Sequence, residues 1–224
     1  MLAGRVIVVA GGGTGIGRAI ALGLEDAHAT VTTVDGDFAS RADAEASLAG
    51  AREAAGPLDA VVHAVVNPAA LTTEALAETA AADWDRRCEA MLRAALHCCQ
   101  AASRELSARG GRLVLVTPTI ALTGAAGLVP YATALEGMRA MAKSAARQWG
   151  ERGITVNCVA PPVELMAPEH AAAPAGLALF ERALGRDPDA RTDVAPVVAL
   201  LVADAAHIVT GATIPVDGGS VMAP

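Results

Sequence analysis

Aromatic side chains are scarce in this sequence. Phenylalanine, tryptophan and tyrosine make up 2% of its 224 residues, although 53% of the residues are hydrophobic. A chain of this length can bury a sizeable core, so the core must consist mainly of alanine, valine and leucine. No change in composition marks a boundary along the chain. We therefore expect a single domain over residues 1–224.

Paired cysteine motifs and an excess of basic residues are also absent. The four cysteines form no CxxC pair and have no zinc-ligand spacing, so we expect reduced thiols, no metal site and a cytoplasmic protein. The net charge of −7 disfavours nucleic acid or an anionic membrane surface as a partner. The longest uncharged run, residues 113–135, is interrupted by prolines and glycines, which favours a strand, a loop and a helix start over a membrane helix.

What the sequence does contain is a strand, a glycine cluster and a helix in immediate succession. Residues 6–10 are apolar and predict a short buried strand, and residues 18–24 predict a helix. This order is typical of the first unit of a dinucleotide-binding fold, in which free N–H groups at the helix start face the phosphates. The positions that we assign to cofactor binding in this unit are Gly11, Gly13, Gly15, Ile16 and Gly17.

An acidic residue ends the next predicted strand. Asp35 follows the strand-like run of residues 29–34 and lies eighteen residues after Gly17. A carboxylate at this place bonds a ribose diol and repels a 2′-phosphate. The sequence therefore predicts NAD, rather than NADP, as the cofactor.

Three segments resemble the short-chain dehydrogenase/reductase family, and the resemblance runs the length of the chain. The sequence AGGGTGIG of residues 10–17 resembles the family's TGxxxGIG loop, with Ala10 in place of threonine. The segment GITVNCVAP, residues 153–161, is similar to its sixth strand, and VTGATIPVDGG, residues 209–219, is similar to its closing TGxxxxVDGG segment. The resemblance implies an α/β fold, a Rossmann-like doubly wound parallel sheet in three layers.

The interval between Asp35 and the strand predicted over residues 60–66 is short for this family. It holds one helical pattern, residues 41–55, where the family has a helix, a strand and a helix. We therefore predict six strands, with one edge strand and one helix missing. The further predicted elements are helices over residues 84–106, 131–149 and 194–202, strands over residues 113–116, 154–159 and 213–216, and an irregular substrate lid over residues 166–188.

The family's NNAG motif, at the end of the central strand, is replaced. Its four positions are His63, Ala64, Val65 and Val66. A histidine at this place could be a ligand or an acid–base group. We favour a structural histidine that is hydrogen-bonded within the fold.

Hydride transfer in the family uses a tyrosine, a lysine four residues later, a serine thirteen residues earlier and an asparagine on the long helix. A free phenol titrates near 10, and a neighbouring ammonium favours its ionised form. Tyr131, the only tyrosine, occupies the tyrosine position, but Leu135, Pro118 and Met91 occupy the other three. Lys143 is twelve residues beyond Tyr131, about 18 Å along a helix, and cannot substitute.

Other polar positions of the family's site are also altered. Thr117 and Thr119 flank Pro118, and a distorted strand end would be needed to turn either hydroxyl into the site, since alternate side chains of a strand face opposite sides. The family's PG dipeptide becomes Pro161-Pro162. Leu165 and Met166 stand where the family has a threonine that bonds the cofactor.

Three functions are compatible with these residues. The first, our main hypothesis, is a non-catalytic or weakly active family member that acts as a structural partner, as a homodimer, a homotetramer or a hetero-oligomer with an active paralogue. The second is an active NAD-dependent oxidoreductase that uses Tyr131 with Thr117 or Thr119. The third is a binding module that senses a nucleotide without turning it over.

Overall fold

The computed structural model describes residues 2–13, 15–106, 110–166 and 181–222. In this part of the chain, parallel strands form one six-stranded sheet with the order β2-β1-β3-β4-β5-β6. The strands are β1 (Val6–Ala10), β2 (Thr30–Val34), β3 (Ala60–His63), β4 (Gly111–Val116), β5 (Ile154–Ala160) and β6 (Thr213–Pro215). The prediction of a six-stranded, Rossmann-like α/β sheet is confirmed, and no described strand lies beyond β2.

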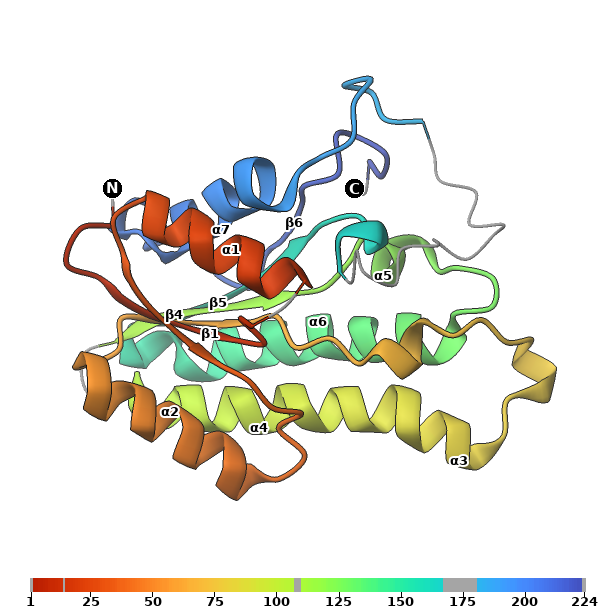
Figure 1. Ribbon diagram of the computed structural model, residues 1–224, viewed down its shortest axis with the longest axis horizontal. Coiled ribbons are helices and arrows are strands. Elements are labelled where there is room, and N and C mark those ends of the chain that lie inside the picture. The colour runs from red at the N-terminus through yellow and green to blue at the C-terminus, as the bar shows by residue number, and fades with distance from the viewer. Residues whose placement is uncertain (1, 14, 107–109, 167–180, 223–224) are drawn as a thin grey trace.

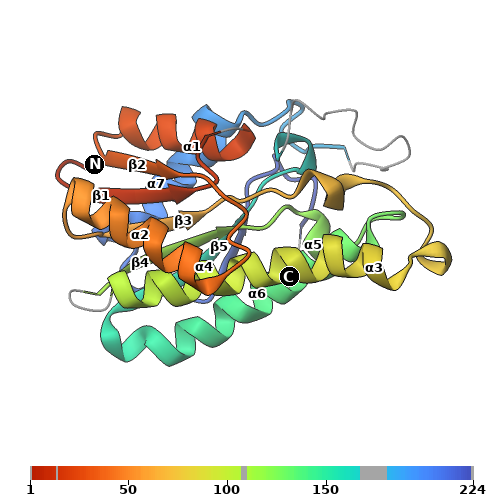
Figure 2. The ribbon, with the colours of Figure 1, turned by 60° about the horizontal axis from the view of Figure 1, so that its bottom comes forward.

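Helices cover both faces of the sheet (Figures 1 and 2). They are α1 (Gly15–Asp26), α2 (Arg41–Ala55), α3 (Ala81–Trp84), α4 (Ala90–Glu105), α5 (Ile120–Thr123), α6 (Val129–Trp149) and α7 (Ala195–Val202). The buried apolar residues of α1 and α7 form one cluster with one face of the strands. Those of α2, α4 and α6 form a second cluster with the other face, so the protein has the three layers that the sequence predicts.

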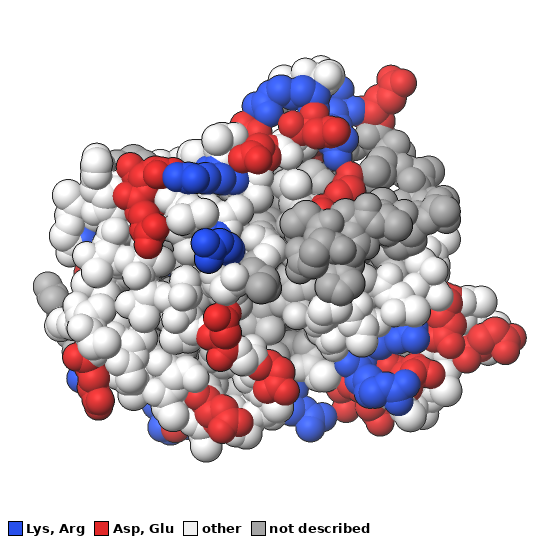
Figure 3. Space-filling model, viewed as in Figure 1, with Lys and Arg blue, Asp and Glu red and all other residues white. Residues whose placement is uncertain are grey.

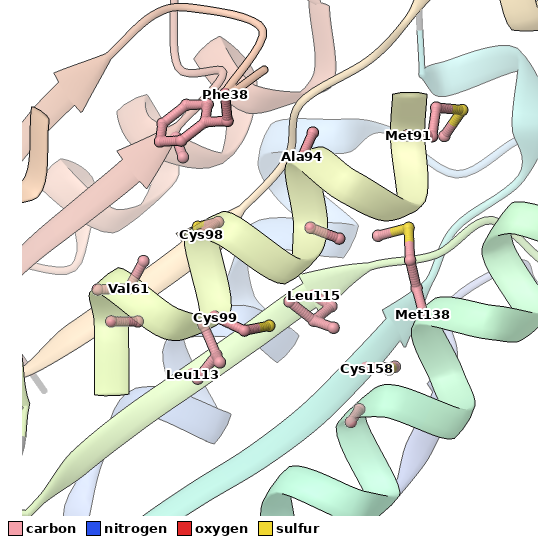
Figure 4. Packing of buried hydrophobic residues seen from close by; sticks show 14 of the residues in the cluster. Phe38, Val61, Met91, Ala94, Cys98, Cys99, Leu113, Leu115, Met138 and Cys158 are labelled. Carbon is pink, nitrogen blue, oxygen red and sulfur yellow. The ribbon is translucent and has the colours of Figure 1, made fainter. Parts of the chain in front are cut away.

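The second cluster is built from small and sulfur-containing side chains, as the scarcity of aromatics requires. Figure 4 shows Cys99 of α4 beside Leu113 and Leu115 of β4, and Cys98 and Met91 of α4 belong to the same cluster. All four cysteines are buried and unbridged. Among the described residues, no group of three or more histidine, cysteine, aspartate or glutamate side chains could hold a metal ion.

Two predicted helices differ from the structure at their starts. The helix predicted over residues 84–106 consists of α3, a π-helical turn over Asp85–Glu89 and α4, and a π-helical turn over Ala190–Val194 precedes α7. A π turn adds a residue to the helical repeat, which a search for 3.6-residue periodicity does not detect. On α4, Leu96 remains exposed by 41%.

The predicted strand over residues 60–66 was too long. β3 ends at His63 because its neighbour β1 ends at Ala10, where the glycine loop turns away, and the pairing stops with these two residues. Of the three apolar residues that follow, Ala64 still donates its backbone N–H to the carbonyl of Ala10 at 2.8 Å, but none is part of the strand. Consequently the end of β3 opens toward the loops instead of continuing the sheet.

A phenylalanine occupies the edge of the fold where the family resemblance implies an additional strand and helix. Phe38 lies in the loop between β2 and α2, with a positive φ of 50°, and its side chain is buried in the cluster with Val61 and Cys98 (Figure 4). Its carbonyl oxygen is 2.8 Å from Nδ1 of His97 on α4. Because positive φ is uncommon outside glycine, we interpret this loop as one held in place by burial of the ring.

The lengths of the helices and the charges on the surface bear on which partners the protein could have. None of the described helices combines the length and the apolar character needed to cross a bilayer. On the face drawn in Figure 3, acidic and basic side chains lie mostly at the periphery and are mixed in sign. This face therefore shows no continuous basic surface among its described residues.

Candidate functional site

The glycine loop between β1 and α1 is packed tightly against its own chain. A Cβ added to Gly17 would lie 1.9 Å from the carbonyl oxygen of Gly11, and one added to Gly11 would lie 2.7 Å from the carbonyl oxygen of Ala64. These two glycines are thus required for close approach of strand, loop and helix. The loop also leads directly into α1, a helix of twelve residues that begins at Gly15 and buries Ile16 and Gly17.

The structure brings Asp35 onto this loop. Its Oδ1 accepts a hydrogen bond of 2.8 Å from the backbone N–H of Gly13, and a Cβ on Gly13 would lie 2.3 Å from Oδ2. Both the carboxylate and the loop are at the carboxyl end of the sheet, where open parallel sheets bind their ligands. The predicted cofactor-binding residues are therefore neighbours in space.

Next to Asp35 lies a cavity of about 370 Å³ between the loops and helix α4. It is at the lower end of the roughly 300–1,000 Å³ range of small-molecule pockets. Its walls come from the residues after β2, the end of β3 and the start of α4. The lining residues are Gly36, Asp37, His63, Val65, Val66, Asn67, Pro68, Ala90, Met91 and Ala94.

His63 is the buried polar group of this cavity. Its exposed fraction is 2%, and its Nδ1 has no hydrogen-bond partner among the described residues. Burial lowers the pKa of His63 to about 4, so the imidazole is neutral at pH 7. The expectation of a histidine hydrogen-bonded within the fold is therefore not met at Nδ1 by any described residue.

At the other end of the cleft, the tyrosine position is closed. The exposed fraction of Tyr131 is 0%, and its hydroxyl has no hydrogen-bond partner in the described part of the chain. Burial raises the pKa of the phenol. One turn along α6, Leu135 is buried in the same apolar cluster, so no ammonium group stands where it would favour the phenolate.

The two threonines beside Pro118 do not supply a replacement hydroxyl. Thr117 is fully buried, and its hydroxyl makes no hydrogen bond of acceptable geometry with the described residues. It faces the Cys158 thiol, whose pKa burial raises to about 11 and the Thr117 and Thr213 hydroxyls partly lower. The backbone N–H of Thr119 donates to the carbonyl of Pro161 at 2.9 Å, and its side chain is buried as well.

The sequence matches a family model described as enoyl-(acyl carrier protein) reductase over residues 18–221. The 3-oxoacyl-(acyl-carrier-protein) reductase FabG of Pseudomonas aeruginosa is 34% identical over 245 residues, covering 99% of this chain and 99% of that protein. FabG of Staphylococcus aureus is 31% identical over 242 residues, covering 96% and 97%.

This chain belongs to the short-chain dehydrogenase/reductase family. Its fold is also that of levodione reductase, with a TM-score of 0.85, 23% identity and 98% of both chains covered. Members of the family generally bind NAD or NADP, and the relatives named here are reductases. The departures that we predict at Pro118, Leu135 and Met91 remain predictions from the family resemblance.

The residues of this family member fit one half of such a cofactor better than the other. Around β1, β2 and β3, the loop glycines, Asp35 and an open cavity are present. Around β4 and β5, Pro161, Pro162 and Val163 are buried, as is Met166. A proline has no N–H to donate, so this end offers few groups that could bond a carboxamide. The part of the predicted lid over residues 167–180 lies outside the described residues.

The sequence did not indicate the cavity. Its walls come from three segments that are far apart in the chain. Of the lining residues, the sequence analysis singled out His63, Val65, Val66 and Met91, but for other reasons. The missing strand was the one signal that this region differs from the family pattern. The loss of that strand does not by itself imply a cavity beside β2. Whether one forms depends on the positions of Phe38 and α4.

Proposed function

We propose that this protein is a non-catalytic or very weakly active member of the family that binds a nucleotide and acts as a partner protein in the cytoplasm. The observation that carries this proposal is the Tyr131 phenol, fully buried and without a partner, with Leu135 one helical turn away. Tyr131 is thus the one titratable residue at the four positions that the resemblance assigns to catalysis. Its phenol is buried and has no described partner that would accept or return a proton.

The energetic argument concerns the phenolate. A phenol with a pKa near 10 must be ionised at a cost of about 4 kcal/mol at pH 7. In the family, a lysine ammonium reduces this cost, whereas here burial raises the pKa further. General acid–base catalysis is most effective with a pKa near the operating pH, so Tyr131 is poorly suited to it.

The nucleotide end supports binding of NAD rather than NADP. Asp35 holds its carboxylate against the Gly13 N–H, where a second negative charge would be repelled. The residues at this end keep the glycine loop, the helix start and the acidic side chain together. We therefore assign the retained function to binding.

The partner role rests on apolar side chains that remain exposed. Leu96 on α4 and Leu200 on α7 are exposed by 41% and 47%, and Ile208 is exposed by 82%. These positions offer surface for a homodimer, a homotetramer or a hetero-oligomer with an active paralogue. Sedimentation of the purified protein alone, and with an active family member from the same organism, tests both forms of assembly.

Turnover is the direct test of the catalytic part of the proposal. Purified protein is assayed with NADH and NADPH against a panel of carbonyl substrates, with an active family member as the positive control. We expect rates far below the usual enzyme range of roughly 1–10³ s⁻¹. A rate within that range that Tyr131→Phe abolishes would show instead an active oxidoreductase that uses this tyrosine.

A further inference from the structure

The outer edge of β2 lies open. Every residue of β2 is exposed or half-buried, whereas β3 and β5 are buried along their whole length. In the described part of the chain, no strand lies beyond β2. Its sequence, TVTTV, has neither a charge nor a proline, which are the residues that commonly protect an edge strand from pairing. This edge therefore offers a template for another strand.

Alternate residues of β2 turn their backbone groups away from the sheet. The N–H of Thr30 donates to the carbonyl of Arg5 at 2.8 Å, and the parallel register with β1 is continuous over the whole of β2. In a parallel ladder, every second residue from Thr30 therefore faces β1, and Val31 and Thr33 face outward. No described residue outside the sheet bonds the N–H or C=O groups of these two residues.

We propose that this edge pairs with the β2 edge of a second copy of the chain, antiparallel about a two-fold axis at Thr32. In this register, Val31 of each copy exchanges N–H···O=C bonds with Thr33 of the other, and β2 pairs along its whole length. The two sheets become one continuous sheet. The inference rests on the partner role in the proposed function, of which it specifies the homodimer, and it places the contact away from the exposed apolar side chains on α4 and α7.

Helix α1 carries a row of side chains above this edge. The helix contacts β2, and on one side it packs against α7, where a Cβ added to Gly23 would lie 2.3 Å from the Cβ of Ala195. Arg18, Leu22 and Glu25 follow each other at steps of three and four residues, so they share the other side of the helix. Arg18 and Glu25 are exposed, and Leu22 between them is half-buried.

This row is complementary to itself about the same axis. The end of α1 and the start of β2 are at one end of the sheet. Leu22 is four residues back from the helix end, about 6 Å, and Thr32 is two residues into the strand, about 7 Å. The two α1 helices are antiparallel, so Arg18 of each copy faces Glu25 of the other. Glu25 is also near the charge of Arg191, whose guanidinium is already hydrogen-bonded to another carboxylate of α1.

On the other face of the sheet, α2 leaves room for its own copy (Figure 1). The helix contacts β2, and on one side it packs against α4, with Arg52 paired to Glu105 at 2.8 Å. Ser47 and Ala54 lie on the opposite side of the helix, and their side chains are short. A pair of short strands is only marginally stable by itself, so the helices on both faces are needed to extend the contact.

A disulfide across the axis is the sharpest test. Thr32 of the two copies form a non-hydrogen-bonded pair with Cα atoms about 4.5 Å apart, within the range that a disulfide spans. We expect Thr32→Cys to give a covalent dimer when oxidised with copper phenanthroline. Thr30→Cys is the matched control on the same face of β2, since its copies are about 13 Å apart. Absence of the Thr32→Cys dimer, or equal cross-linking of Thr30→Cys, would overturn the inference.

Charge reversal tests the contact without an oxidant. We expect Arg18→Glu to raise the dimer dissociation constant, measured by sedimentation, at least about tenfold, because it places like charges opposite each other. The double variant Arg18→Glu/Glu25→Arg should return it to within about threefold of the wild type. Arg147→Glu, an exposed arginine on α6, is the control and should change nothing. A monomeric wild type, or a dimer insensitive to Arg18→Glu, would refute the proposed contact.

These results separate the inference from the proposed function. Carbonyl turnover at a normal rate would refute the non-catalytic role and leave the β2 contact as it is. A monomer in sedimentation would overturn the contact, whereas assembly with an active paralogue would still support the partner role.

Discussion

The two ends of the cleft keep different amounts of the family's chemistry. At the end formed by β1, β2 and β3, functional groups are on the surface or beside a cavity, as shown by Asp35 on the Gly13 N–H and by His63. At the end formed by β4, β5 and α6, Thr117, Tyr131 and Leu135 are buried. Both ends are built on the same regular sheet.

This difference teaches that scaffold and chemistry are separable in this fold. Backbone pairing and apolar burial determine the sheet, and both are intact with Leu135 at the position where the family resemblance implies a lysine. Indeed, leucine at this position adds a side chain to the core. Function resides in particular side chains rather than in the fold, and here Tyr131 and Leu135 at one end of the cleft are part of the core.

The largest effect on this comparison is expected from Leu135→Lys. An ammonium placed without a partner in the apolar cluster should lower the free energy of unfolding by about 4 kcal/mol at pH 7. Burial lowers the pKa of the introduced lysine below its unfolded value near 10.4, so the loss should shrink as the pH rises toward that value. Urea denaturation at pH 7 and pH 9.5 measures it, with Leu135→Met as the volume-matched control. A variant as stable as the wild type would show that this end is open to water.

The second effect concerns pH and His63. The folded pKa of about 4 lies below the unfolded value near 6.5, so the unfolded state binds the proton first as the pH falls. Stability should thus be unaffected by this group above pH 6.5 and decrease by about 3 kcal/mol between pH 6.5 and pH 4. Urea denaturation across this range should show that His63→Phe lacks this part of the loss. If the free energy of unfolding of the wild type and of His63→Phe changed equally with pH, the assignment of this loss to His63 would be contradicted.

A third test addresses the glycine loop. Gly17→Ala places a methyl group 1.9 Å from the Gly11 carbonyl oxygen, and we expect it to lower the free energy of unfolding by about 2 kcal/mol and to weaken nucleotide binding. Gly50→Ala is the matched control, since its Cβ meets nothing within 4 Å and alanine is favoured in helices. An unchanged Gly17→Ala variant would mean that α1 can shift away from the loop.

The smallest effect is expected from Tyr131→Phe. Removing a buried hydroxyl without a partner should raise the free energy of unfolding by about 1 kcal/mol or less. Nucleotide affinity should be unchanged, since Tyr131 lines neither described cavity. Thermal denaturation and calorimetry measure both. Destabilisation by this substitution would indicate that the hydroxyl is paired in solution.

Much of the scaffold could be predicted from local patterns. The helix over Arg41–Ala55 and the first strand were predicted with their observed bounds, because apolar periodicity and glycine or proline boundaries are local signals. The short interval after Asp35 indicated the missing strand. The π turns before α4 and α7 were not predicted, since an additional residue in one turn leaves no mark in composition.

For the candidate site, too, some features follow from the sequence and others from the tertiary structure. The sequence alone predicts, through the family resemblance, that Leu135, Pro118 and Met91 stand where the family has polar residues, because these positions follow from spacing along the chain. Only the tertiary structure decided that Tyr131 is buried and that His63 lines a cavity with Asp37 and Ala94. Burial and cavities depend on how segments distant in sequence pack against each other, and here the loss of one edge strand, the inward Phe38 ring and the position of α4 together determine that packing.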